Sequence, residues 1–191
     1  DMADWIDSLL ASLGVAQATL VGHSQGVLVA LETASRHPER VAALTLIAGA
    51  MAIPVNDALI EMSQSAPEKA YRMMTSWGHG PGAHKFDNTQ PGHAFLGYGR
   101  RVMAQNDGTA LHADLVACNS YDGGKDAAAS VTQPSLCLLA GKDKMTPVKF
   151  GRKMAEQISD AQCHVFERAG HFLPAEFPIE VNDAMAAFLS R

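Results

Sequence analysis

A parallel β-sheet covered by helices on both faces is the fold that this sequence of 191 residues predicts. Short apolar runs, each too brief for a helix, alternate with segments whose apolar residues recur at helical spacing. The run 41–48 is apolar almost throughout, which is typical of a strand buried on both faces of a parallel sheet. We therefore expect a single α/β core that carries an insertion.

Four strands and their helices are expected in two groups, separated by a long middle segment. The strands are predicted at 18–21, 41–48, 135–140 and 163–167. The core helices are predicted at 1–13, 27–36, 147–158 and 179–189. We expect 1–50 and 132–191 to form the core and 51–131 to form a helical cap, with helices near 56–64, 67–77 and 94–105.

Composition and charge exclude several classes of protein. The chain is 47% hydrophobic and 18% charged, which is enough apolar material for a packed core and excludes a disordered chain. Its net charge is -5 and its basic residues are scattered, so no nucleic-acid partner is expected. The apolar run 41–53 is shorter than the roughly 20 residues that span a bilayer, so no membrane association is expected. Three cysteines without CxxC spacing and no visible signal peptide favour a reducing, cytoplasmic setting.

The segment Gly22-His23-Ser24-Gln25-Gly26 matches the pattern G-x-S-x-G between a predicted strand and a predicted helix. In that context the serine occupies a sharp, strained turn that projects its hydroxyl above the sheet. We expect glycine to be required at positions 22 and 26, because side chains there would collide with the crossing strand and helix. The backbone N–H of Gln25, at the start of the helix, is expected to donate to an oxyanion. Ser24 is therefore the predicted nucleophile.

A serine hydroxyl needs a base to take its proton and an acid to orient that base. His171 follows the last predicted strand, and Asp143 follows the third. The carboxyl ends of parallel strands open on one crevice, so both side chains are expected near Ser24. No carboxylate occurs in 47–51 after the second strand, which leaves Asp143 as the expected acid.

These motifs, in the chain order Ser, Asp, His, resemble the α/β-hydrolase fold family, of the small esterase and lipase-like type, over about 1–50 and 132–191. The resemblance implies a serine hydrolase that cleaves a carboxylic ester or related acyl compound through an acyl-enzyme, with no cofactor and no metal. It implies that Ser24 is the nucleophile, His171 the general acid and base, and Asp143 the group that fixes the imidazole tautomer.

Three alternatives stay open beside this interpretation. Two use the same triad: a cofactor-free haloperoxidase or perhydrolase, and a hydrolase of carbon–carbon bonds. The third is a non-catalytic binding or assembly subunit with a vestigial triad. Relatives in the family begin with several strands before the serine motif, and this sequence begins one helix before it. The resemblance thus implies that the N-terminal strands and the second oxyanion donor are missing, and that the first strand is an open edge for self-association or a partner chain.

The middle segment carries further candidates. His79-Gly80-Pro81-Gly82 resembles the family's oxyanion motif but follows Ser24 in the chain, so we expect a plain loop. His79, His84 and His93 lack the spacing of a familiar metal site. Arg100-Arg101 is expected to be solvated, and His23 to be a packing residue. The sequence leaves open whether one apolar set lines an acyl pocket or only packs the cap; its members are Met51, Met62, Met73, Met74, Met103, Trp77, Phe86, Phe95 and Tyr98.

Overall fold

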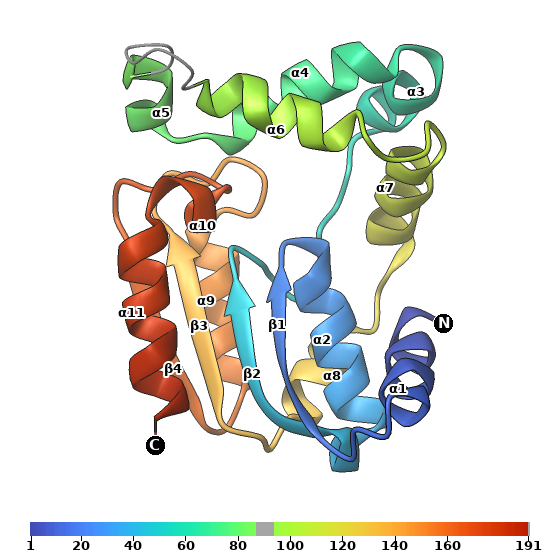
Figure 1. Cartoon of the computed structure of the whole chain (residues 1–191), viewed down its shortest axis with the longest axis vertical. Coiled ribbons are helices and arrows are strands. Elements are labelled where there is room, and N and C mark those ends of the chain that lie inside the picture. The colour runs from blue at the N-terminus through green and yellow to red at the C-terminus, as the bar shows by residue number, and fades with distance from the viewer. Residues whose placement is uncertain (87–93, 191) are drawn as a thin grey trace.

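The computed structural model of the chain describes residues 1–86 and 94–190, apart from the side chains of Phe86 and Phe95. Its centre is a four-stranded sheet, and a layer of helices lies across one end of that sheet (Figure 1). The strands are β1 (Ala18–His23), β2 (Val41–Ile47), β3 (Ser135–Ala140) and β4 (Ala161–Phe166). All neighbours pair in parallel in the order β1-β2-β3-β4, which confirms the predicted parallel sheet.

The helices fall into a core group and a cap group. The core group comprises α1 (Met2–Ser12), α2 (Gln25–Arg36), the 3-10 turn η1 (Pro38–Arg40), α8 (Gly124–Ser130), α9 (Val148–Gln157), α10 (Leu173–Glu176) and α11 (Pro178–Leu189). The cap group comprises α3 (Asp57–Ser65), α4 (Pro67–Gly78), α5 (Pro81–Phe86), α6 (Phe95–Met103) and α7 (Ala110–Ser120). The sequence did not predict α5, α7 or α8. The expectation of a plain loop through Pro81 and Gly82 is wrong, because α5 begins at Pro81.

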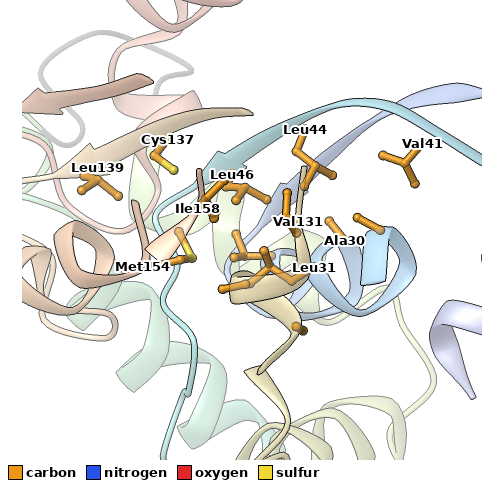
Figure 2. Close-up of a cluster of buried hydrophobic side chains, with 14 residues drawn as sticks. Ala30, Leu31, Val41, Leu44, Leu46, Val131, Cys137, Leu139, Met154 and Ile158 are labelled. Carbon is orange, nitrogen blue, oxygen red and sulfur yellow. The ribbon is translucent and has the colours of Figure 1, made fainter. Parts of the chain in front are cut away.

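One face of the sheet is covered by α2, α8 and α9, which share a cluster of buried side chains (Figure 2). Leu31 of α2, Leu44 and Leu46 of β2, and Met154 of α9 are completely buried in it. Val131, directly after α8, is buried in the same cluster. Because of this packing we describe α8 with the core, although it falls within 51–131.

The opposite face is covered by α10 and α11. Leu138 of β3 and Leu173 of α10 are completely buried there, together with Val181 and Phe188 of α11. The two clusters hold the sheet between layers of helices, and the cap has a cluster of its own around Leu59 and Met74. Within the described residues, no helix is long and apolar enough to cross a bilayer.

Strand β1 is one edge of the described sheet, since it pairs with β2 alone. Val21 on this edge strand is 53% exposed. The predicted helix at the start of the chain is present as α1 and packs on α2, but its apolar side chains are only partly covered. Leu10 is buried, whereas Trp5 and Leu13 are 62% and 65% exposed.

The crossing of β1 and α2 is very close. A Cβ atom on Gly22 would lie 2.3 Å from the carbonyl oxygen of Gly26, so only glycine fits at position 22. A Cβ atom on Gly26 would meet no atom within 4 Å. The expected collision is therefore confirmed for Gly22 and wrong for Gly26. The backbone of Gly26 is what a side chain at position 22 would meet, and a side chain at position 26 would meet nothing.

This difference gives a prediction for two matched substitutions. Gly22→Ala should lower the free energy of unfolding by about 3 kcal/mol, because backbone must move to admit the methyl group. Gly26→Ala should raise it by about 0.5–1 kcal/mol, because alanine has less freedom than glycine in the unfolded chain and fits the helix. Urea unfolding measures both values. Equal effects of the two variants would contradict the close approach of Gly22 to the backbone of Gly26.

Thr45 in β2 is completely buried, and its hydroxyl has no hydrogen-bond partner among the described residues. Thr45→Val keeps the shape and removes the unpaired group, so it should raise the free energy of unfolding by about 1 kcal/mol. Thr33→Val is the control, because the equally buried Thr33 hydroxyl donates to the Val29 carbonyl at 2.7 Å. A loss of stability in both variants would show that the Thr45 hydroxyl is in fact paired.

Candidate active site

The carboxyl ends of the strands meet beneath the cap (Figure 1). Ser24 directly follows β1, Asp143 lies shortly after β3, and His171 lies in the loop between β4 and α10. Ser24 and His171 line one cavity of about 390 Å³, and Asp143 lies behind His171. The structure thus brings together the residues that the sequence predicted for the site.

Ser24 occupies the sharp turn between β1 and α2. Its backbone has φ 55° and ψ -119°, a conformation that side-chain-bearing residues rarely adopt and that costs on the order of 1–3 kcal/mol. The Ser24 N–H donates to the carbonyl of Ile47 at 3.0 Å, which ties the turn to β2. The hydroxyl does not cap α2, so helix formation does not consume it.

Gln25 is the first residue of α2, so its backbone N–H precedes the hydrogen-bond ladder of the helix. That position beside Ser24 suits an oxyanion donor, because the N–H dipoles of a helix start favour negative charge. The Gln25 side chain points to the cap and donates to the backbone carbonyl of Asp114 at 3.3 Å.

Asp143 and His171 form a buried pair. Nδ1 of His171 lies 2.8 Å from Oδ2 of Asp143, and the two side chains are 3% and 0% exposed. Burial acts to raise the pKa of Asp143, but the hydrogen bond and charge of His171, with hydrogen bonds from Thr146, lower it below its usual value. With Nδ1 donating to Asp143, Nε2 of His171 is the nitrogen left to accept a proton.

Thr146 is a part of this arrangement that the sequence analysis missed. Its backbone N–H and that of Met145 each donate to Oδ1 of Asp143 at 2.8 Å. Its hydroxyl lies 2.8 Å from both Oδ2 of Asp143 and the carbonyl of Ala48, and can donate to one of them at a time. A side chain that accepts backbone N–H groups two and three residues later in the chain forms an Asx turn. The aspartate at the start of this short turn is the signal that the sequence offered.

His23 contacts His171 through a hydrogen bond and through its ring. Its Nε2–H donates to the carbonyl oxygen of His171 at 2.7 Å, and the two ring centroids lie 4.9 Å apart. Burial, and next the neighbouring His171, lowers the pKa of His23 to about 4, so the ring is neutral at neutral pH. These contacts agree with the expected packing role.

Cap side chains close the cavity opposite Ser24. Met74 and Trp77 of α4 and Met103 of α6 line it, so these members of the open apolar set border the cavity. Met62 and Met73 pack inside the cap cluster and Met51 packs against the core. Tyr98 is 66% exposed, and the side chains of Phe86 and Phe95 lie outside the described part of the chain.

The other candidates that the structure describes do not line this cavity. Arg100 and Arg101 are exposed and line a separate hollow beside α4. Nδ1 of the buried His79 donates to the carbonyl of Thr75, and Nε2 of His84 to that of Ser76, both at 2.8 Å. His93 lies outside the described residues.

One group of possible metal ligands occurs among the described residues, and it lies away from this cavity. Its members are Asp7, His37 and Glu39, near the start of β2. Nε of Arg40 lies 2.7 Å from Asp7, so that carboxylate already has a positive partner.

The pKa of His23 gives a prediction for stability. Between about pH 6.5 and pH 4 the unfolded chain binds a proton at this histidine and the folded chain does not. The free energy of unfolding should therefore fall as pH falls through this window, by up to about 1.4 kcal/mol per pH unit from this group. His23→Gln retains an N–H donor for the His171 carbonyl and should show a shallower decline. The exposed His164→Gln is the control, and equal slopes in His23→Gln and the unsubstituted protein would contradict the assignment.

Comparison with known proteins places the chain among relatives of one fold. The model of the family described as "Alpha/beta hydrolase family" matches residues 1–184. The chain is 22% identical over 200 residues to 2-hydroxy-6-oxononadienedioate/2-hydroxy-6-oxononatrienedioate hydrolase of Pseudomonas sp, covering 96% of this chain and 66% of that protein. Among the first curated relatives, this chain spans 50% to 68% of their length.

Solved structures agree with this assignment. The enol-lactonase from Burkholderia xenovorans LB400 superposes with a TM-score of 0.89 at 19% identity, over 99% of this chain and 72% of that one. Bromoperoxidase from Bacillus anthracis gives a TM-score of 0.85 at 18% identity, over 99% and 73%. These likenesses establish the fold, and the match to the family model covers nearly the whole chain. The chain therefore belongs to the alpha/beta hydrolase family.

Proposed function

We propose that this chain carries the active site of a serine hydrolase that cleaves a carboxylic ester or a related acyl compound. The observation that carries the proposal is the buried His171–Asp143 pair, with a 2.8 Å contact, whose histidine lines the same cavity as Ser24. A serine, a histidine and a buried carboxylate in this order along the chain match the α/β-hydrolase arrangement.

In the first half of the reaction, the Ser24 hydroxyl attacks the substrate carbonyl while Nε2 of His171 takes its proton. The carbonyl oxygen becomes an oxyanion, which the backbone N–H of Gln25 stabilises. Asp143 holds Nδ1–H of His171 and stabilises the imidazolium that forms. His171 then gives the proton to the leaving alcohol, and the acyl group remains on Ser24.

In the second half, water takes the place of the alcohol. His171 removes a proton from the water, which attacks the acyl carbonyl, and Ser24 leaves with the returned proton. Gln25 supplies one oxyanion donor, and loss of a second donor costs about 10²–10³ in kcat in a serine protease. A further donor outside this sequence would therefore raise the rate without changing these roles.

The cap suggests which part of a substrate the cavity accepts. The cavity lining is mostly apolar, with Met74, Trp77 and Met103 from the cap and Phe172 from the His171 loop. Flexible thioether side chains adapt to irregular apolar groups. Asp114 and Lys144 also line the cavity. We therefore assign only its apolar part to the acyl group of the substrate.

A second candidate is hydrolysis of a carbon–carbon bond on the same residues. It is favoured by relatives named as hydrolases of 2-hydroxy-6-oxononadienedioate and of 2-hydroxymuconate semialdehyde, at 22% and 26% identity. A third candidate is a peroxide-dependent reaction, which is suggested by a bromoperoxidase of similar fold. Loss of a chromogenic dienol substrate without ester turnover would favour the second candidate, and peroxide-dependent bromination the third.

Labelling with a fluorophosphonate tests the nucleophile, with intact mass as the readout. We expect one adduct on the chain, because an activated serine attacks phosphorus as it attacks a carbonyl. Ser24→Ala should abolish the adduct, and Ser120→Ala, an exposed serine on α7, should leave it unchanged. Turnover of 4-nitrophenyl esters should fall at least about 10³-fold in Ser24→Ala and in His171→Ala.

Two outcomes would contradict the proposal. An adduct that persists in Ser24→Ala would place the nucleophile elsewhere. A folded chain that forms no adduct and turns over no ester, even when extended at its N-terminus, would favour a non-catalytic binding or assembly subunit.

A further inference from the structure

The loop that carries His171 is joined to the cap as well as to the sheet. The backbone N–H of Phe172 donates to the carbonyl of Gly78, at the end of α4, at 3.1 Å. The Phe172 ring lies against the ring of His79, with centroids 4.7 Å apart. Residues 78–80 of the cap and 170–172 of the His171 loop thus form one junction, which we call the cap–histidine junction.

Glycines allow the two backbones of this junction to touch. A Cβ atom on Gly170 would lie 2.2 Å from the Gly80 nitrogen, and one on Gly78 would lie 2.3 Å from the Phe172 ring. A Cβ atom on Gly80 would lie 2.7 Å from a carboxylate oxygen of Glu176. The segment around His79 and Gly80 is therefore packed against the His171 loop, and no side chain separates them.

Glu176, the last residue of α10, joins both sides of the junction with one carboxylate. Oε1 accepts the backbone N–H of Gly170 at 3.1 Å, and Oε2 accepts that of Gly80 at 2.9 Å. Both glycines are buried and Glu176 is half-buried, so water has little access to replace these bonds. A carboxylate that accepts N–H bonds forms shorter and stronger hydrogen bonds than a neutral acceptor.

Gly170, His171 and Phe172 each have a backbone group that is held by a hydrogen bond to another segment. His23 holds the His171 carbonyl, Gly78 holds the Phe172 N–H, and Glu176 holds the Gly170 N–H. Gly170 precedes His171 and has the widest range of backbone conformations of any residue. Its N–H bond to Glu176 therefore fixes the residue directly before His171. The preceding residue, Ala169, is held separately, because its N–H donates to the Phe166 carbonyl and its carbonyl accepts from the Lys142 N–H.

We propose that Glu176 is a positioning residue for the reaction: it fixes His171 against the cap so that Nε2 stays within reach of Ser24. This inference rests on the proposed function. Glu176 does not line the cavity of Ser24 but a separate hollow, together with Arg168 and Lys142. It therefore acts on the placement of the base and does not contact the substrate.

The test compares Glu176→Ala and Glu176→Gln with Glu180→Ala, an exposed glutamate at the start of α11, in the full chain. A displacement of about 1 Å can cost about 10²-fold in rate, so we expect Glu176→Ala to lower kcat for a 4-nitrophenyl ester by about 10–100-fold. KM should stay within about twofold because Glu176 itself does not line the substrate cavity. Glu176→Gln retains one carbonyl acceptor and should recover part of the loss, and Glu180→Ala should match the unsubstituted protein.

A second readout does not depend on turnover. We expect the Nδ1 proton of His171, hydrogen-bonded to Asp143, to give a far-downfield NMR signal. That signal should broaden or exchange faster in both Glu176 variants and not in Glu180→Ala. Unchanged kcat and an unchanged signal in folded Glu176→Gln would overturn the inference, as would a rise in KM at constant kcat. Absence of ester turnover in every protein, including the unsubstituted one, would contradict the proposed function, and the NMR signal would still decide the role of Glu176.

Discussion

The parallel direction of the four strands is the constraint on which the site depends. Because every strand ends at the same edge of the sheet, residues far apart in the sequence arrive beneath the cap (Figure 1). β1 delivers Ser24, β2 delivers the Ala48 carbonyl, β3 leads to Asp143, and β4 leads to His171. An antiparallel partner in this sheet would send one of these loops to the opposite end. Strand direction therefore decides which side chains can meet.

The site holds two features that oppose folding. Ser24 has a backbone conformation that is unfavourable for residues with side chains, and Asp143 is a charge removed from water. Each is stabilised by polar groups from neighbouring segments, the Ile47 carbonyl for the turn and Thr146 and His171 for the carboxylate. The apolar clusters on both faces of the sheet supply the stability that keeps this arrangement fixed.

The core could be read from the sequence because its signals are local. β2 and β3 are almost wholly apolar, and Gly22 to Gly26 marks the turn that places Ser24. The segment between β2 and β3 was harder to predict. α7 has apolar residues on all sides and α8 is a short run rich in alanine, so neither shows a helical stripe. Glu176 accepts backbone N–H bonds from Gly80 and Gly170, and such contacts leave no pattern of side-chain spacing. The Thr146 contacts follow only from a short turn after Asp143. The open space at Gly26 likewise depends on tertiary geometry alone.

The insertion between β2 and β3 also determines the order in which this centre is assembled. β1 and β2 pair across a short connection, whereas β3 and β4 join them only after the whole cap has been traversed. Contacts of such wide sequence separation form slowly, because the loop must close before they gain energy. During synthesis the proposed nucleophile therefore emerges first and its base last. A nascent chain carries Ser24 without the imidazole that we propose activates it, so the proposed acyl transfer could begin only when folding is nearly complete.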